Sequence, residues 1–424
     1  MQTPLEARFP AASSPWFIRE VPVVSTDGPK IAFALLIVFV LMLYSSIAIV
    51  LPQLNPLRPV LLVAAAALVM LAIELPQTAQ GFRFTRPQTL LLIAFLGVAV
   101  ASTFTALYMK LAFNTTLDFS KIVLIYIVIE NTVTTESRLR KILWALVIGG
   151  LFPALGTIHH FVNGILIEGS RGSWVGVFKN PNEDAYCLAV LVPLALALGA
   201  KSKLPARLLL WTITGIYLVG IFLTFSRGSM IGLVAGLALV GWRQRSVVIR
   251  MLMIAGLVGG LLGGGAFWTR NQGFNRDLSQ DTTFRQRIGT IKAGGFMFLD
   301  HPILGVGPLN SIVAYPLYVP EEFLDCGCQN QLVIHNSFVQ VLAELGLPGF
   351  ILFMALLGTS LLDVRKLQSG PIGAYASGLE ISLWVFVVCG LAGGFIYTWS
   401  PYLLIALIVA TKHITQSNAV ETPA

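Results

Sequence analysis

Four arginines in this sequence have the chemistry to bind phosphate. Arg171 lies in EGSRGSWVGVF, Arg227 follows an apolar run in LTFSRGSMIGLVAG, and Arg285 and Arg287 lie in TTFRQRIG. A guanidinium keeps its charge and donates paired hydrogen bonds, so it suits phosphate oxygens. Grouped on one face, the four predict a phosphate or pyrophosphate site. Taken singly, each could instead reach lipid headgroups or pair with a nearby acid such as Glu168.

A histidine begins a late apolar segment, in VIHNSFVQVLAELGLPGF. The unperturbed imidazole titrates near neutrality, so His335 suits a general base that deprotonates a hydroxyl, although a histidine at a membrane interface is more often an ordinary polar residue. Asn336 could cap the following helix or orient a substrate. Glu344 stands nine positions further on, before a GLPG break, where an acid needs a partner. It could orient His335 or hold the helix break together.

Two other polar stretches have plainer explanations. GVFKNPNEDAYCLAV places Asn182 and two acids at a helix start, and helix capping explains most of it. Cys326 and Cys328 are separated by one residue, where ring closure is strained. A disulfide, two free thiols and an adventitious metal site are all open for this pair.

Composition identifies the environment of these residues. Hydrophobic residues make up 56% of the chain and charged residues 11%, and the mean hydropathy is +0.79. A soluble fold could not bury so much apolar surface. About 20 apolar residues cross a bilayer as a helix. The sequence therefore predicts an all-α polytopic membrane protein with about twelve transmembrane helices, near 31–51, 57–75, 88–109, 119–133, 141–163, 184–200, 206–224, 229–242, 246–268, 335–362, 375–397 and 401–414.

The distribution of Lys and Arg predicts which loops face the cytoplasm. Counted from a cytoplasmic N-terminus, the alternate loops on that side hold seventeen Lys and Arg residues, against six in the short loops opposite and five in one long loop. Cytoplasmic loops carry such an excess. Because the cations lie between apolar runs, the net charge of +8 does not indicate a nucleic-acid partner.

The chain then divides into five parts. We expect a cytoplasmic segment at 1–30, helices one to nine at 31–268, a large loop outside the cytoplasm at 269–334, three helices at 335–414 and a cytoplasmic tail at 415–424. The large loop contains a helical pattern at 284–299 and reads as folded. Its polar residues make it the predicted place for chemistry.

These motifs together resemble the bacterial O-antigen ligase and polymerase superfamily, which are membrane glycosyltransferases. Four pieces occur in that family's order over about 165–360: Arg171 through Asn182, the SRG of Arg227, Arg287 ahead of DHPILGVG, and HN followed nine residues later by GxxG. The last piece is the most specific of the four.

The resemblance implies a metal-independent, cofactor-free transfer in the periplasm, on the outer face of the bacterial inner membrane. The donor would be a glycan on undecaprenyl diphosphate, and the acceptor a hydroxyl of lipid A–core or another glycan. Arg227 and Arg287 would hold the diphosphate, helped by Arg285 or Arg171, and His335 would take the acceptor proton. Asn336, Glu344 and Asn182 complete the predicted substrate-binding set.

Two alternatives remain open at this stage. A polymerase of the same superfamily would extend the glycan instead; the Arg-x10-Gly pattern cited for polymerases is not evident, because Asn182 and Phe298 stand eleven positions after Arg171 and Arg287. A transporter or flippase would usually place its ionisable residues near the bilayer midplane, whereas these lie at predicted outer edges.

Overall fold

The protein is described here by a computed structural model, which covers residues 28–78, 81–242, 282–326 and 331–421 and the helical positions 247 and 251. In that part the chain forms helices and loops, with an isolated β-bridge between Ile167 and Arg171. The α-helices are α1 (Lys30–Ser45), α2 (Ile47–Val50), α3 (Pro59–Glu74), α4 (Gln88–Phe104), α5 (Met109–Thr132), α6 (Glu136–Gly149), α7 (Leu151–Val162), α8 (Pro181–Ala200), α9 (Leu204–Leu223), α10 (Arg227–Trp242), α12 (Thr282–Asp300), α13 (Ser311–Tyr318), α14 (Ser337–Lys366), α15 (Gly373–Gly390) and α16 (Trp399–Glu421); the 3-10 turns are η1 (Pro52–Leu57), η2 (Leu75–Gln77), η3 (Gly176–Phe178), η5 (Glu321–Cys326) and η6 (Leu367–Ser369).

Seven helical segments among the described residues are long and apolar enough to cross a membrane, and α1, α4 and α10 are shorter apolar helices. The seven are Pro52–Gln77, Met109–Thr132, Glu136–Val162, Pro181–Ala200, Leu204–Leu223, Ser337–Ser369 and Gly373–Gly390. The chain is an all-α membrane protein, as the composition predicts. The number of twelve crossings stays a prediction, and its segment 246–268 lies outside the described residues apart from the helical positions 247 and 251.

Helices α4 and α5 differ from their expected bounds. The apolar runs 88–109 and 119–133 correspond to α4, which ends at Phe104, and to α5, which already begins at Met109. Polar residues in the first half of α5 hide this start from a hydropathy profile. Backbone hydrogen bonds continue through them regardless, and Lys121 pairs with Asp118 at 2.6 Å within the helix. The expected short span is therefore a helix of 24 residues.

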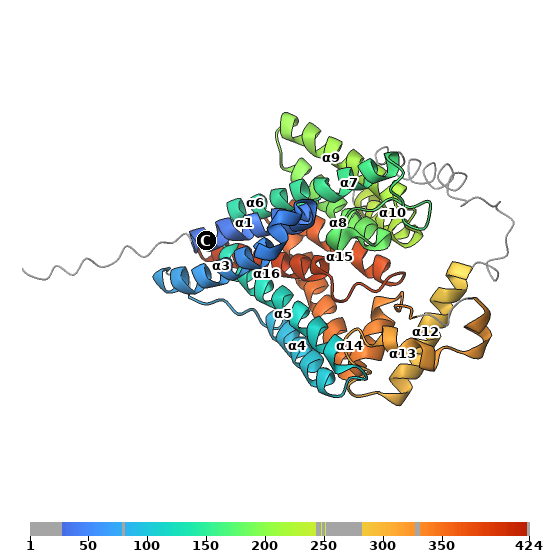
Figure 1. The fold of residues 1–424 in the computed structure, drawn as a ribbon. Coiled ribbons are helices and arrows are strands. Elements are labelled where there is room, and N and C mark those ends of the chain that lie inside the picture. The colour runs from blue at the N-terminus through green and yellow to red at the C-terminus, as the bar shows by residue number, and fades with distance from the viewer. Residues whose placement is uncertain are drawn as a thin grey trace, which may run out of the picture.

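The core of the bundle is formed by α8, α15 and α16 (Figure 1). Sixteen of the 20 residues of α8 are buried, and in α16 every residue from Tyr402 to Ala410 is at most 4% exposed. By contrast, α3 buries only Ala67 and Leu71 and lies at the edge. A helix that is apolar all round is expected inside such a bundle, while an edge helix faces lipid.

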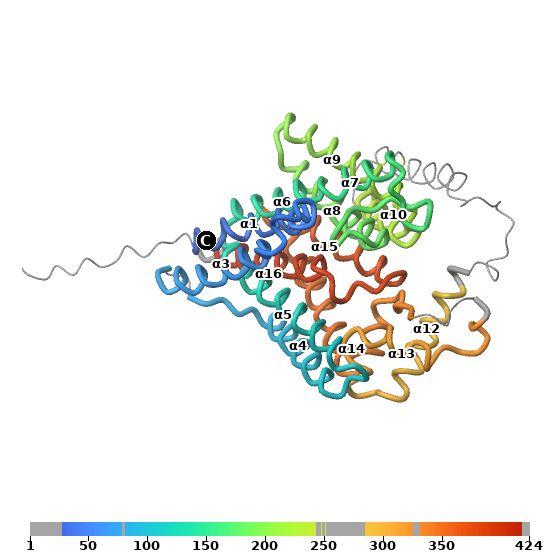
Figure 2. The backbone as a smooth tube through the Cα atoms, viewed as in Figure 1, coloured from blue at the N-terminus to red at the C-terminus, as the bar shows by residue number. Residues whose placement is uncertain are grey.

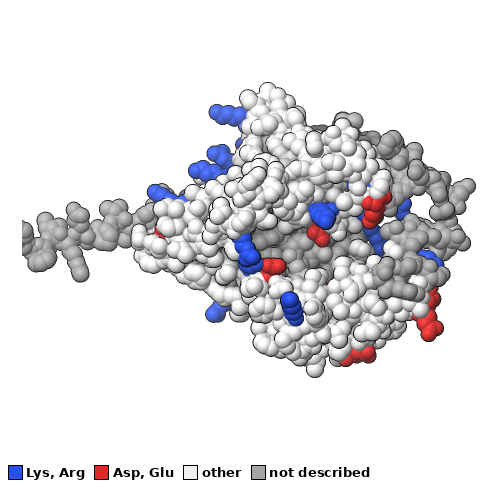
Figure 3. Space-filling model, in the orientation of Figure 1, with Lys and Arg blue, Asp and Glu red and all other residues white. Residues whose placement is uncertain are grey.

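One end of the bundle collects the cation-rich loops and is called the basic end below. It contains the starts of α1, α4, α6 and α9 and the last turns of α5, α8, α14 and α16. Lys201 Nζ donates to the Pro371 carbonyl at 3.0 Å, and Arg138 Nη2 donates to the Gly28 carbonyl at 3.0 Å. Lys and Arg side chains project around this end, on the left in Figure 3. The structure thus places together cations that the charge scheme assigns to one side.

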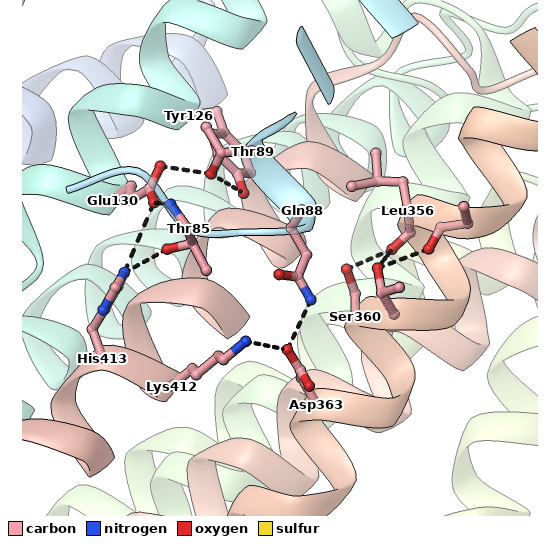
Figure 4. Close-up of polar contacts among 12 residues, drawn as sticks. Thr85, Gln88, Thr89, Tyr126, Glu130, Leu356, Ser360, Asp363, Lys412 and His413 are labelled. Atoms are coloured by element: carbon pink, nitrogen blue, oxygen red, sulfur yellow. Dashed lines mark hydrogen bonds and ion pairs between the residues drawn. The ribbon is translucent and has the colours of Figure 1, made fainter. Parts of the chain in front are cut away.

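A polar network locks four helices at the basic end (Figure 4). Glu130, fully buried on α5, accepts from the Thr85 amide at 2.6 Å and from Thr89 Oγ1 at 2.9 Å. Asp363 of α14 accepts from Lys412 Nζ of α16 at 2.6 Å and from Gln88 Nε2 at 2.9 Å. Buried carboxylates are stable when their lone pairs are satisfied in this way.

Helices α12 and α13 form a small unit at the opposite end (Figure 2). The expected helix at 284–299 is confirmed as α12. Ala293 and Met297 of α12 pack with Tyr315 of α13, Phe323 of η5 and Ile334 in a hydrophobic cluster of their own. This unit also contacts α14, so the predicted outer loop is folded over the part that the structure describes.

Helix α14 is broken at the predicted position. Gly346 has φ 66°, ψ −168°, inside an otherwise helical segment. The DHPILGVG turn fills the break: Val306 N donates to the Ala343 carbonyl at 2.9 Å, and Leu347 N to the Pro302 carbonyl at 2.8 Å. A side chain at Gly305 would lie 2.2 Å from the backbone of Glu344, so glycine is required there. Two motifs of the sequence therefore pack against each other.

Candidate active site

Arg171 anchors the loop between α7 and α8. Its side chain is 8% exposed; Nε donates to the Thr224 carbonyl at 2.8 Å, and Nη2 donates to Asn182 Oδ1 at 2.6 Å. Glu168 forms an ion pair with it at 3.6 Å. A planar guanidinium with partners on several sides is held in one orientation. Arg171 is therefore a fixed cation at the end of the bundle opposite the basic end, called the site end below.

Asn182 joins the start of α8 to the turn before α10. Its Oδ1 accepts from Ser226 Oγ at 2.9 Å as well as from Arg171, and Ser229 Oγ donates to its backbone carbonyl at 3.3 Å. Ser226 was not a predicted site residue, although its place beside Arg227 in SRG was a signal. The segment from Arg171 to Asn182 and the SRG motif therefore depend on each other, because each supplies hydrogen-bond partners to the other.

Arg227 is the first residue of α10 and is exposed. The turn before it is tight, with Phe225 in the left-handed region at φ 52°. The next residue, Gly228, lies against the loop after α15: an added Cβ would stand 2.6 Å from the Cβ of Ala392. This close approach sets the position of the arginine beside that loop.

The loop after α15 links Arg227 to the start of α14. Asn336 Nδ2 donates to the Leu391 carbonyl at 3.2 Å, and Ser337 Oγ donates to the Gly393 carbonyl at 2.7 Å. The sequence predicted one apolar span at 375–397, whereas α15 ends at Gly390. Hydropathy misses this loop because its residues are apolar, and the pair Gly393-Gly394 was the signal that the helix stops.

His335 stands two residues before the first residue of α14. Asn336 is the cap of that helix, since its Oδ1 accepts from the amides of Phe338 and Val339, both at 3.0 Å. This is the capping alternative of the sequence analysis. The cap fixes the backbone that carries His335, as an N-cap does at any helix start. The imidazole itself is half-buried.

Charges from two distant segments act on His335. Burial, and after it the charges of Arg287 and Arg171, lower the pKa of its imidazole to about 4, while Glu168 opposes them. Such effects require the groups to be near one another, because salt and water screen distant charges. The structure thus brings Arg171, Arg287 and His335 to the same end of the bundle, where both arginines favour the neutral imidazole.

The two arginines of α12 have different surroundings. Arg287 is half-buried and acts on His335. Arg285 Nη2 donates to the Glu322 carbonyl at 2.7 Å and its guanidinium lies 6.0 Å from the Phe323 ring centroid, both in η5. Residues two apart on a helix do not share a face. Arg287 is therefore the arginine of this helix that the structure places with the histidine.

Glu344 is fully buried beneath the site, in α14. It accepts from Ser311 Oγ at 2.5 Å, Leu309 N at 2.8 Å and Gln340 Nε2 at 3.2 Å. Of the two roles suggested by the sequence, these contacts favour holding the helix break and the DHPILGVG turn together.

A mostly apolar cavity of about 820 Å³ lies between α1, α3, α5 and the start of α16. Its lining includes Arg58, Asp118, Lys121 and Glu183, and Glu183 follows Asn182 in the first turn of α8. The cavity therefore reaches the edge of the site. Among the described residues, no group of three or more His, Cys, Asp or Glu side chains is placed to hold a metal ion, and Cys328 and the Cys326 side chain lie outside that part.

The fold and site define an all-α membrane protein with an arginine–histidine centre at one end of its helices. Residues 210–354 match the family model described as O-antigen ligase, roughly a third of the chain. The predicted resemblance to the O-antigen ligase superfamily is confirmed. The matched segment contains Arg227, Arg285, Arg287, His335, Asn336 and Glu344, while Arg171 and Asn182 precede it. A search of curated proteins found no match.

Proposed function

We propose that this protein is a glycosyltransferase of the O-antigen ligase type. It would move a glycan from undecaprenyl diphosphate to a hydroxyl of lipid A–core or a similar acceptor, on the periplasmic side of the inner membrane. The observation that carries this proposal is the arrangement at the site end: Arg171 is held by Asn182 and the Thr224 carbonyl, and its charge and that of Arg287 both lower the pKa of His335. Fixed cations beside a group able to accept a proton are what transfer from a diphosphate leaving group requires.

The roles follow from the charges in the reaction. The acceptor oxygen forms a bond to the sugar carbon, the bond from that carbon to the diphosphate breaks, and the diphosphate leaves with the electron pair. Arg287 and Arg227 would stabilise the negative charge that grows on it, with Arg171 behind them. His335 would accept the hydroxyl proton, and none of these steps calls for a metal ion.

The low pKa of His335 also fits a loaded site. Arg287 and Arg171 disfavour the protonated form of the imidazole. A bound diphosphate would neutralise both cations and raise the pKa of the imidazole, so the histidine becomes a stronger base when the donor is present. The apolar cavity beside Glu183 would accommodate part of the undecaprenyl chain.

Orientation belongs to the same proposal. With both termini in the cytoplasm and about twelve crossings, the basic end would face the cytoplasm and the site end the periplasm. The cation excess of the basic-end loops supports this orientation. Labelling of single-cysteine variants at Lys110 and Lys203 from either side of intact cells tests it, with opposite accessibility expected.

A polymerase of the superfamily is the nearest alternative. It would lengthen the lipid-linked glycan, so a deletion strain that still makes long lipid-linked polymer but leaves lipid A–core bare excludes it. A flippase is less well supported, because Glu344 at the broken helix is enclosed by protein donors. Movement of lipid-linked glycan between leaflets with no cleavage of the diphosphate linkage would contradict transfer.

The direct test is reconstitution of the purified protein with lipid-linked oligosaccharide and candidate acceptors. We expect glycan on the acceptor with release of undecaprenyl diphosphate, and loss of both in His335→Ala and Arg227→Ala. Near-wild-type transfer by both variants would overturn the assigned roles.

A further inference from the structure

A cation-lined groove lies at the basic end, between α1 and α6. It consists of two adjoining cavities of about 720 and 610 Å³, which share Ile37 and Lys141. The larger one extends to the turn between α8 and α9. Since α8 has 20 residues and rises 1.5 Å per residue, this groove lies about 30 Å from the site end of that helix. It is separate from the candidate active site.

Four exposed cations surround the larger cavity. Arg140 and Lys141 come from α6, and Lys201 and Lys203 from the turn after α8. Among the residues that the structure describes, no acid lines either cavity. Of the acids nearby, Glu74 accepts from three amides at the start of α1, and Glu136 lies one turn before Arg140. The groove therefore presents a local excess of positive charge from two directions.

The walls of the groove are apolar and turned outward. Ile37 and Leu41 lie one turn apart on α1, and Trp144 and Ile148 are similarly spaced on α6. Ile148 is 42% exposed. Tryptophan favours the level where lipid headgroups meet hydrocarbon. Cations at one end of a groove with apolar walls match one anionic lipid molecule, with its headgroup among the cations and its chains along the helices.

We propose that this groove binds a phospholipid with two phosphates, of the diphosphatidylglycerol class. One phosphate would lie at Arg140 and Lys141 of α6, and the other at Lys201 and Lys203 of the turn after α8, so that each element supplies one pair of cations. Basic pockets between membrane helices bind such headgroups. The occupant is a lipid because apolar walls on α1 and α6 continue from the cations.

Native mass spectrometry of the full-length protein, released from nanodiscs containing diphosphatidylglycerol, phosphatidylglycerol and phosphatidylethanolamine, tests the proposal. We expect the wild type to retain diphosphatidylglycerol in preference to phosphatidylglycerol at equal total phosphate. Arg140→Ala/Lys203→Ala should weaken that retention about tenfold or more, since each surface cation contributes to binding. Equal retention of the two anionic lipids by the wild type would overturn the proposal.

Matched variants separate a site from general attraction to a charged surface. Arg86→Ala/Lys366→Ala removes the same charge at the same end outside the groove, and retention should change less than twofold. Arg140→Lys/Lys203→Arg keeps the charge and should retain the lipid. Equal loss in both alanine pairs contradicts a site. If the groove variant does not fold, the wild-type lipid preference and the charge-retaining variant still decide.

Discussion

The two ends of the bundle present positive charge in different ways. At the site end Arg171 is 8% exposed and held by the Thr224 carbonyl and Asn182. At the basic end Arg140 and Lys203 are exposed beside an apolar groove. A fixed cation needs no reorganisation when charge develops during a reaction, which is a requirement of catalysis. Exposed cations on flexible side chains suit an anion that only has to stay bound.

The largest effect should come from the histidine. His335→Ala removes the proposed base at the site end, and transfer should fall by about 10² to 10⁴-fold. Glycan transfer in membrane vesicles, normalised to protein amount, measures it. His301→Ala is the matched control, because His301 is exposed in a nearby turn, and it should leave the rate unchanged. Similar losses in both variants would contradict a specific role for His335.

The next largest loss of transfer should come from changing Arg287. Arg287→Ala removes a charge placed for the leaving diphosphate, and the rate should fall by about 10² to 10³-fold, as when one donor to a developing anion is lost. Lys292→Ala, five residues further along α12 and paired with Glu322, is the control. Single-turnover transfer with saturating donor lipid would distinguish the two; a lysine at 287 should restore part of the rate. Equal rates for both alanine variants would place the catalytic charge elsewhere.

Asn182→Ala tests whether the fixed geometry matters. It leaves the donors of Arg171 and Ser226 without their shared acceptor, which should cost about 1–3 kcal/mol of stability. Transfer should fall about tenfold, or about 1.4 kcal/mol in the barrier, because Arg171 is no longer held. Thermal unfolding in detergent and the transfer assay give the two readouts. Asn163→Ala, at the exposed end of α7, is the comparison, and unchanged transfer in Asn182→Ala would show that the network is not needed.

The smallest effect concerns pH. Transfer should be lost at low pH when His335 of the free protein becomes protonated and can no longer accept a proton. The acid limb of kcat/KM should therefore lie near pH 4. Bound diphosphate neutralises the arginines, so the acid limb of kcat should lie at higher pH. Rates measured from pH 3.5 to 8 with a stability control would show the separation. Coincident acid limbs of kcat and kcat/KM would mean that the arginines do not act on the histidine.

Most helices follow from the sequence because their causes are local. About 20 apolar residues and an unbroken backbone specify a spanning helix, and charge between the runs specifies the loops. The break at Gly346 and the helix at Thr282–Asp300 were predictable for the same reason. The start of α5 and the end of α15 were not predictable from hydropathy. Polar residues lie inside the first half of α5, and apolar residues continue beyond the end of α15.

The sequence by itself determined the class of protein, the motifs and the residue types able to act on a diphosphate. Only the tertiary structure decided that Arg171, Arg287 and His335 converge, that Arg285 contacts η5, and that Glu344 supports the helix break. It also placed the loop after α15 between Arg227 and Asn336. The physical reason is that helix formation depends on neighbours in the chain, whereas the meeting of side chains depends on how distant helices pack.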